Sequence, residues 1–447
     1  MAMTGSGPAS YDAARAFRTI GLLAEKEDPY TEAGRPASHY PGARPIGKDA
    51  ALQALEAQPV SRTELFLGFL SLGLLGFGGI APWARHIIVE RRRWLSERAF
   101  GDLVALAQFL PGPASSQTGF AIGLARGGYL GGLAAWLGFT LPSALLLLAF
   151  AYGAGSLADA PLGAGLLHGL KLVAVAIVAQ AVFGMAGKLC PDRPRAAIAL
   201  AALALLAFHP GSLGQVAAIA LGGLAGLAFC RGDLGAAADD TPMPVSRAVG
   251  VACLAAFFGL LILAFVPVPA GLLALFGAFY RSGGLVFGGG HVVLPLLRDA
   301  VVTPGWVSDN AFLAGYGAAQ AVPGPLFTFA AYLGAVAGAP PAGVVGAVVA
   351  VTAIFLPGML ALTGVLPFWH QLRTQPNAQA AMRGVNAAVV GLLASALYNP
   401  VWVSAVRTPA DFALAAVGFA LLIVWRAPPL TVVLLSGAAG ALLAAAR

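Results

Sequence analysis

The sequence predicts an all-α polytopic membrane protein that is built from two homologous halves. Three observations support this prediction: 59% of the 447 residues are apolar and only 10% are charged, long stretches carry no charge, and one six-residue pattern occurs twice. The mean hydropathy of +0.82 lies far outside the composition of ordinary soluble domains. Helices are expected throughout, because an open sheet edge would leave backbone groups unsatisfied in lipid.

Three stretches of the chain contain no Asp, Glu, Lys or Arg. They cover residues 127–158, 248–280 and 311–372, and each exceeds the roughly 20 residues that cross a bilayer. The net charge of +7 is carried mostly by short segments between these apolar stretches, where basic residues set orientation. Nucleic acid is therefore not an expected partner, and the lipid bilayer is.

The pattern Gln-x-x-Pro-Gly-Pro at residues 108–113 recurs at residues 320–325. Flanking residues keep the same register, since Trp94 corresponds to Trp306 and Phe100 corresponds to Phe312. The repeated unit is far too long for a solenoid, and in an apolar chain it indicates a transporter made of two related halves.

The order of polar and apolar segments divides the chain into four parts. A polar, disordered cytoplasmic tail is expected at 1–61, because this segment is rich in Pro, Gly and mixed charge. The first half follows at 62–230, a linker with a connector helix at 231–269, and the second half at 270–447. Four full spans are expected in the first half, at 129–153, 167–187, 196–208 and 213–229, with partners in the second.

Basic residues predict that the second half is inverted relative to the first. The loop after the second Phe-Gly-Gly holds Arg298 alone, whereas its first-half counterpart holds five arginines: Arg85, Arg91, Arg92, Arg93 and Arg98. The segment 154–167 carries no Lys or Arg, while the matching segment 367–383 carries two. The positive-inside rule places equivalent loops on opposite faces.

Each Pro-Gly-Pro predicts a helix that breaks within the membrane. Residues 103–125 are uncharged, but Pro111-Gly112-Pro113 removes amide donors in the middle of this run. A new helix is expected near Ala114, with free N–H groups and the positive end of a helix dipole. Each broken segment should re-enter rather than cross, so that inversion brings the two tips together near the midplane.

This arrangement predicts an anion site at the two tips. The alternative is that Pro-Gly-Pro only kinks helices so that they pack, but duplication at matching positions favours function. A glutamine before each break could hydrogen-bond across it. The candidate substrate-binding residues are Gln108, Gly112, Pro113, Ser115, Ser116, Gln320, Gly324, Pro325 and Thr328.

Two further groups of residues are candidates. Glycine runs allow close approach of a ligand or of another helix, which adds Gly78, Gly79, Gly288 and Gly289. Four basic side chains could attract the anion or couple protons: Arg126, Lys171, His86 and His291. The alternatives are that Lys171 extends to the interface and that both histidines are satisfied polar neighbours.

Enzyme chemistry is not expected. The three cysteines form no Cys-x-x-Cys, and none of the six histidines is paired at ligand spacing within a span. A hydrolase would need a nucleophile with a base or a metal cluster. No metal and no cofactor are therefore predicted.

The sequence resembles a known family at these motifs. "FGG" followed by "ERRRW", then "QFLPGP", with "FGGGH" and "QAVPGP" in the second half, is similar to the long-chain chromate transporters of the CHR superfamily. The resemblance covers residues 62 to about 440, and the second half lacks the Glu-Arg-Arg element. The family pattern falls on Phe77, Gly78, Gly79, Glu90, Arg91, Arg93, Trp94, Gln108, Pro111, Gly112 and Pro113.

The resemblance implies efflux of chromate across the bacterial inner membrane, coupled to the proton-motive force and giving chromate resistance. The expected partners are chromate or a related oxyanion and protons, in a monomer or a homodimer. A transporter of sulfate or another tetrahedral oxyanion is the alternative, because a site of N–H groups, Ser and Gln reads only charge and shape.

Overall fold

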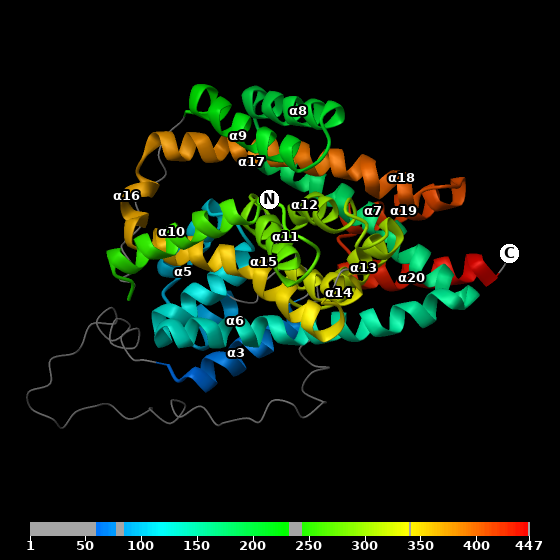
Figure 1. Cartoon of the computed structure of the whole chain (residues 1–447), viewed down its shortest axis with the longest axis horizontal. Coiled ribbons are helices and arrows are strands. Elements are labelled where there is room, and N and C mark those ends of the chain that lie inside the picture. Colours follow the sequence, from blue (N-terminus) through cyan, green and yellow to red (C-terminus); the bar gives the residue numbers. More distant parts are fainter. Residues whose placement is uncertain (1–59, 77–84, 232–243, 339–340, 446–447) are drawn as a thin grey trace, which may run out of the picture. The chain divides into compact units, whose positions relative to one another are not determined.

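The protein is described by a computed structural model that covers residues 60–76, 85–231, 244–338 and 341–445. Within these ranges all regular structure is helical (Figure 1). Five helical stretches are long and apolar enough to cross a membrane, at Ala114–Ala154, Pro161–Leu189, Ser212–Phe229, Gly343–Arg373 and Pro376–Ala405. The predicted all-α, membrane-spanning class is confirmed. Nearly all of the predicted tail, part of the linker and the motif Phe77-Gly78-Gly79 lie outside the described residues.

In the described residues before the second repeat there are eight helical elements. They are α3 (Arg62–Leu75), η1 (His86–Arg91), α5 (Glu97–Phe109), α6 (Ala114–Asp159), α7 (Pro161–Leu189), α8 (Arg193–Phe208), α9 (Ser212–Phe229) and the connector α10 (Arg247–Leu263). The short span expected at 196–208 corresponds to α8, which begins earlier because Asp192 caps it by accepting from the Arg195 amide.

The second repeat follows the same order with more interruptions. Its elements are α11 (Leu272–Gly284), η2 (Gly290–Val292), α12 (Val293–Val301), α13 (Asp309–Ala321), η3 (Leu326–Thr328), α14 (Phe329–Val336), α15 (Gly343–Val365), η4 (Leu366–Phe368), α16 (Trp369–Arg373), α17 (Pro376–Ala396), η5 (Leu397–Trp402), α18 (Val403–Ala405), α19 (Pro409–Ile423) and α20 (Pro429–Ala445). Ser96 caps α5 and Ser308 caps α13 in the same way.

The two repeats exchange helices. α7 of the first half packs along α19 and α20 of the second, and α17 of the second packs along α8 and α9 of the first. Small residues allow this contact: a Cβ atom added at Gly169 would lie 2.1 Å from the Ser436 carbonyl oxygen, and one added at Gly384 would lie 2.1 Å from the Gly222 carbonyl oxygen. The halves therefore interlock reciprocally.

Equivalent helices run in opposite directions. In Figure 1, α6 ends beside the start of α7 on the right, whereas its counterpart α15 leads to α16 on the left. The next pair, α7 and α17, also run in opposite directions in this view. This is the inverted arrangement that the basic loops predict.

Both Pro-Gly-Pro segments re-enter. In the first half, Val60 N–H donates to the Arg126 carbonyl at 3.1 Å, and Arg92 contacts Glu64 at 3.3 Å, so both ends of the segment lie at the start of α3. In the second half, Gly338 N–H donates to the Trp306 carbonyl at 2.8 Å. Each segment thus returns to the side from which it entered.

α6 consists of two helices joined at Gly128, where φ is 64°. A Cβ atom added at Gly123 would lie 2.4 Å from the carbonyl oxygen of Gly131. Residues eight apart in a straight helix are separated by about 12 Å, so the chain folds back on itself at this point. The second part of α6 is the predicted span at 129–153.

Candidate functional site

Both predicted helix breaks are present. α5 ends at Phe109 and α6 begins at Ala114, while α13 ends at Ala321 and η3 begins at Leu326. At the tips, Gly112 has φ of 118° and Gly324 has φ of 113°. Glycine is required at these positions, because L residues with a side chain rarely adopt such angles.

Each tip is held by the other half. Gly112 N–H donates to the Val286 carbonyl at 2.8 Å, and Gly324 N–H donates to the Gly76 carbonyl at 3.2 Å. Val286 and Gly76 each stand directly before a Phe-Gly-Gly motif. Each tip is therefore bonded to the residue that stands before the Phe-Gly-Gly motif of the other half.

The tips also rest on the long helices of the opposite half. A Cβ atom added at Gly112 would lie 2.8 Å from the Cα atom of Gly358 in α15. One added at Gly324 would lie 2.7 Å from the Ser143 hydroxyl in α6. Gly358 and Ser143 follow the equivalent prolines Pro357 and Pro142. On the same two helices, Trp136 of α6 packs edge-on against Phe355 of α15, with ring centroids 5.7 Å apart.

Buried polar atoms without a hydrogen-bond partner gather around the tips. Burying such a group unpaired costs about 1–3 kcal/mol, so in a native structure it often marks a functional site. Ser116 and Gln117 follow the first tip, Gln320 precedes the second, and Trp136 and Thr140 lie on α6. Among the unpartnered buried atoms of the described residues, five belong to these side chains: Ser116 Oγ, Gln117 Oε1, Trp136 Nε1, Thr140 Oγ1 and Gln320 Nε2. These five atoms are called the unpartnered group below.

Gln117 bridges the first break, and sequence reasoning missed it. Its Nε2 donates to the carbonyl oxygens of Pro111 and Gly358, both at 2.9 Å. Cross-break bonding was expected of Gln108, but Gln108 is exposed on α5. No repeat signal marks Gln117, because the equivalent residue in the second half is Phe329.

The amide groups at the start of α6 are available to a ligand. Pro113 precedes the helix without a side-chain cap, and Gln117 N–H is the amide that bonds to the Pro113 carbonyl, at 2.9 Å. The preceding N–H groups, including those of Ser115 and Ser116, have no intrahelical acceptor. A buried helix N-terminus of this kind favours an anion.

The second tip differs from the first. The Thr328 hydroxyl donates to the Pro325 carbonyl at 2.7 Å and is thus engaged in its own turn. Its neighbours are aromatic: Phe327 packs on Phe355 with ring centroids 5.9 Å apart, and Phe329 packs on Tyr332 at 6.1 Å. Polar groups therefore concentrate at the first tip, and Gln320 is the polar contribution of the second.

The glycine motif of the second half has two residues with positive φ. Gly288 has φ of 76° and Gly289 has φ of 149°. A Cβ atom at Gly288 would lie 3.3 Å from Val389 and 3.4 Å from the Asn386 amide oxygen. Close helix packing, which was the alternative to ligand approach, accounts for Gly288. Gly78 and Gly79 lie outside the described residues.

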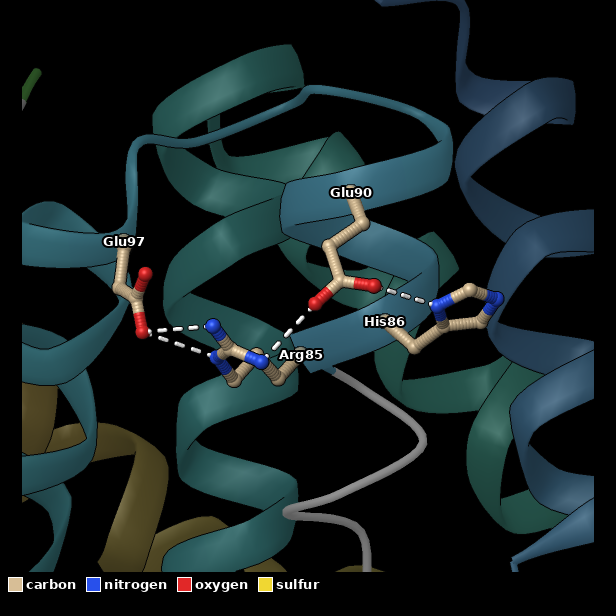
Figure 2. Close-up of polar contacts among 4 residues, drawn as sticks. All are labelled: Arg85, His86, Glu90 and Glu97. Carbon is tan, nitrogen blue, oxygen red and sulfur yellow. Dashed lines mark hydrogen bonds and ion pairs between the residues drawn. The ribbon is translucent and has the colours of Figure 1, made fainter. Parts of the chain in front are cut away.

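His86 belongs to an exposed loop cluster, shown in Figure 2, and not to the tips. Its Nδ1 lies 2.7 Å from Glu90 Oε2, and Arg85 contacts Glu90 at 2.9 Å and Glu97 at 2.8 Å. The hydrogen bond with His86, together with the charge of Arg85, lowers the pKa of Glu90 below its ordinary value.

The remaining basic candidates lie in three different places. His291 Nδ1 contacts the Tyr316 hydroxyl at 2.7 Å, and its neighbour Gly290 is close to Leu326 of the second tip. Lys171 Nζ donates to the Asn310 amide oxygen at 3.1 Å, at the start of α13. Arg126 is buried, and its carbonyl accepts from Val60. Of the four basic candidates, His291 is the one whose described contacts lead to a tip.

One buried ion pair and one histidine–carboxylate contact between the halves were not predicted. Asp102 of α5 pairs with Arg373 of α16 at 2.8 Å, and Asp411 of α19 pairs with His168 of α7 at 2.7 Å. The partners are 271 and 243 positions apart, so no local pattern could reveal them. Among the described residues, no group of His, Cys, Asp and Glu could hold a metal ion.

A helical protein with two inverted halves and paired re-entrant breaks has the architecture of a secondary membrane transporter. Comparison with known proteins identifies the family. The chromate transporter family model matches residues 63–227 and 273–441, one region for each half. The chain therefore belongs to the chromate transporter family, and the predicted resemblance is confirmed.

The chain is similar to several curated transport proteins. It is 32% identical to the chromate transport protein of Pseudomonas aeruginosa over 88% of this chain and 94% of the relative. It is 26% identical to the chromate transport protein of Cupriavidus metallidurans over 79% and 86%, and 23% identical to an uncharacterized transporter of Methanocaldococcus jannaschii over 74% and 83%. No solved structure matches the chain.

Proposed function

We propose that this protein exports chromate from the bacterial cytoplasm across the inner membrane and binds the oxyanion between its two Pro-Gly-Pro tips. One observation carries the site: the start of α6 offers free amide groups beside the buried, unpartnered hydroxyl of Ser116. Relatives of this chain are named chromate transport proteins, and chromate is an anion that such a site suits.

The unpartnered group supplies hydrogen-bond donors without a fixed charge. Ser116, Trp136, Thr140 and Gln320 each present a buried donor, and the amides of α6 add others. A dianion in a low-dielectric site needs several donors or a cation. Uncharged donors meet that need without holding the ion too tightly for release.

The membrane potential favours export. Moving an anion out of an inside-negative cell is favourable by about 2.3 kcal/mol per negative charge per 100 mV. Uptake would need accompanying cations, which are usually bound by buried acidic residues. The buried carboxylates Asp102 and Asp411 are each paired with a basic side chain, which supports export over cation-coupled uptake.

His291 is the proposed carrier of a coupling proton from the proton-motive force. It is half-buried, it contacts Tyr316, and it lies near the second tip. His86 is exposed and held by Glu90, so it is the weaker candidate. We expect His291→Gln to change the net number of protons moved per chromate in liposomes, and His86→Gln to leave it unchanged. Equal proton movement in both variants would remove His291 from the mechanism.

Transport of sulfate or another tetrahedral oxyanion is the alternative, because chromate and sulfate share shape and charge.

A transport assay tests the proposed function. The protein is purified and reconstituted in liposomes loaded with chromate, and a membrane potential is imposed. Chromate should leave at a rate that increases with the potential, more slowly in Ser116→Ala than in the control Gly101→Ala, since a Cβ atom at Gly101 contacts nothing within 4 Å. Transport of sulfate in place of chromate would favour the alternative.

A further inference from the structure

The unpartnered atom of Gln117 can only accept a hydrogen bond, whereas the other four atoms of the unpartnered group can donate one. Its side-chain nitrogen has two hydrogens, and two carbonyl oxygens, those of Pro111 and Gly358, accept from it. This pair of bonds fixes the orientation of the amide. Oε1 is therefore an acceptor, and it is buried without a partner in the described structure. Gln117 itself is 1% exposed.

The amide of Gln117 lies in the helix break itself. A Cβ atom added at Gly112 would lie 3.2 Å from Gln117 Nε2 and 3.4 Å from its Cδ, and one added at Gly358 would lie 3.3 Å from Nε2. Oε1 is bonded to Cδ and so shares this place at the first tip. Ser116, whose hydroxyl is unpartnered, is the adjacent residue at the start of α6.

A fully deprotonated oxyanion does not match this set of groups. Its four oxygens only accept hydrogen bonds, so a carbonyl oxygen pointed at it is repelled and stays unpaired. A monoprotonated oxyanion has three accepting oxygens and one O–H donor. Ser116, Trp136, Thr140 and Gln320 can each donate to the anion, whereas Gln117 Oε1 can only accept, and this acceptor fits the monoprotonated form.

We propose that the site selects the monoprotonated tetrahedral oxyanion, hydrogen chromate, whose O–H donates to Gln117 Oε1. This inference rests on the proposed chromate function and names the protonation state that the site takes. Chromate keeps one proton in an appreciable fraction near neutral pH, whereas sulfate is protonated only in strong acid. Sites that hydrogen-bond a substrate hydroxyl reject analogues without it by about 10⁴-fold, and Gln117 gives this site the means to reject sulfate.

The two halves do not share this property. The residue equivalent to Gln117 is Phe329, which packs among aromatic rings behind the second tip. The selective contact therefore belongs to the first tip alone. The only covalent bond that changes is the O–H bond of the anion. The anion takes a proton from water on the side of the membrane where it is loaded and returns it to water on the other side. This proton moves outward with the anion, opposite to a proton that His291 would carry inward.

The test measures binding of chromate to the full-length protein in detergent between pH 5.5 and 8.5. If only hydrogen chromate binds, the apparent Kd for total chromate rises about tenfold per pH unit above the second ionisation of chromate, because affinity scales with the competent fraction. Inorganic phosphate, which keeps a proton at these pH values, should compete better than sulfate or selenate. An apparent Kd that is constant across this range, or equal competition by sulfate and phosphate, would overturn the proposal.

Two variants separate the acceptor from the donors. Gln117→Met removes the acceptor, so the dependence of Kd on pH should flatten and sulfate should gain competitive strength. Ser116→Ala removes a donor and should weaken binding by a similar factor at every pH, with the slope retained. A protein that binds no chromate at any pH would refute the proposed function itself. If Gln117→Met does not fold, the slope and competition order of the unaltered protein still decide the matter.

Discussion

The backbone amide of Gly112 donates to the carbonyl oxygen of Val286 at 2.8 Å, and the equivalent bond joins Gly324 to Gly76 at 3.2 Å. Each Pro-Gly-Pro tip is thus fixed to the segment that leads into the Phe-Gly-Gly motif of the opposite half. Any motion that shifts one half against the other must stretch or rearrange both bonds together. The reciprocal contact therefore couples the two tips to the relative position of the halves.

Alanine at Gly112 should impair transport more than alanine at Gly324. Both positions have positive φ, which costs a residue with a side chain about 1–2 kcal/mol. The Cβ atom at Gly112 would meet the Cα atom of Gly358 at 2.8 Å, and backbone cannot rotate away. At Gly324 it would meet the Ser143 hydroxyl at 2.7 Å, which is part of a rotatable side chain. We expect chromate efflux to fall about tenfold or more in Gly112→Ala, which corresponds to about 1.4 kcal/mol.

The matched control is Gly101→Ala, in the helix before the first break. An added Cβ atom there contacts nothing within 4 Å, so transport should be unchanged or the protein slightly more abundant. Efflux is measured in cells and normalised to the amount of protein in the membrane. Normal efflux by both tip variants at normal abundance would show that the tips do not form the site.

Cysteine labelling should place Ser96 and Ser308 on opposite faces of the membrane. Both serines are exposed and cap equivalent helices, so Cys replaces them at a cost of about 1 kcal/mol each. The three native cysteines are first replaced by Ala. An impermeant reagent applied to intact cells should label Ser308→Cys and should reach Ser96→Cys only after the membrane is opened. Equal labelling of the two in intact cells would refute the inversion.

The ion pair between Asp102 and Arg373 should stabilise the contact between the halves. The two side chains are only 12% and 10% exposed, and removing one partner of such a buried pair costs about 3–5 kcal/mol, because it leaves an uncompensated charge. Asp102→Ala should lower the apparent Tm in detergent, and the double variant with Arg373→Ala should recover part of the loss. The control Glu97→Ala breaks the exposed pair with Arg85 and should cost about 0–1 kcal/mol. Equal shifts in Tm for the two single variants would contradict a stabilising role for the buried pair.

Local chemistry made the helix breaks predictable from sequence. Pro111 and Pro113 lack amide donors, and Gly112 tolerates positive φ, so the break follows from three adjacent residues. The re-entry of each segment was predicted from charge, because the positions of the basic residues place both ends of the segment on one side of the membrane. The repeat then extended both inferences to the second half.

Contacts that depend on tertiary packing could not be predicted from local sequence chemistry. Gln117 spans the first break by bonding to Gly358, which is 241 positions away, and it has no counterpart in the repeat. The exchange of α7 and α17 between the halves depends on small residues such as Gly169 and Gly384, which meet carbonyls of the other half. A single sequence gives no signal for such pairs. Gln108 was chosen instead because it belongs to the repeated pattern, and the pattern marks the break rather than the residue that bridges it.

The loop cluster of Arg85, His86, Glu90 and Glu97 should respond to acid through Glu90. Its pKa is lowered from an ordinary value of 4.5, chiefly by the hydrogen bond with His86. A carboxylate with a lowered pKa stabilises the folded loop fully above the ordinary value, and this contribution is lost as pH falls through the lowered value. Glu90→Gln should imitate the acid state at every pH.

Hydrogen exchange of the segment 86–97, corrected for intrinsic rates, measures this effect. We expect protection in the unaltered protein to fall several-fold as the solution is taken below pH 4.5. Glu90→Gln should show the lower protection already at pH 7, with no further change in acid. The control Glu64→Gln removes the contact with Arg92 and leaves Glu90 in place, so it should keep the acid transition. The same transition in Glu90→Gln as in the unaltered protein would assign the acid response to another group.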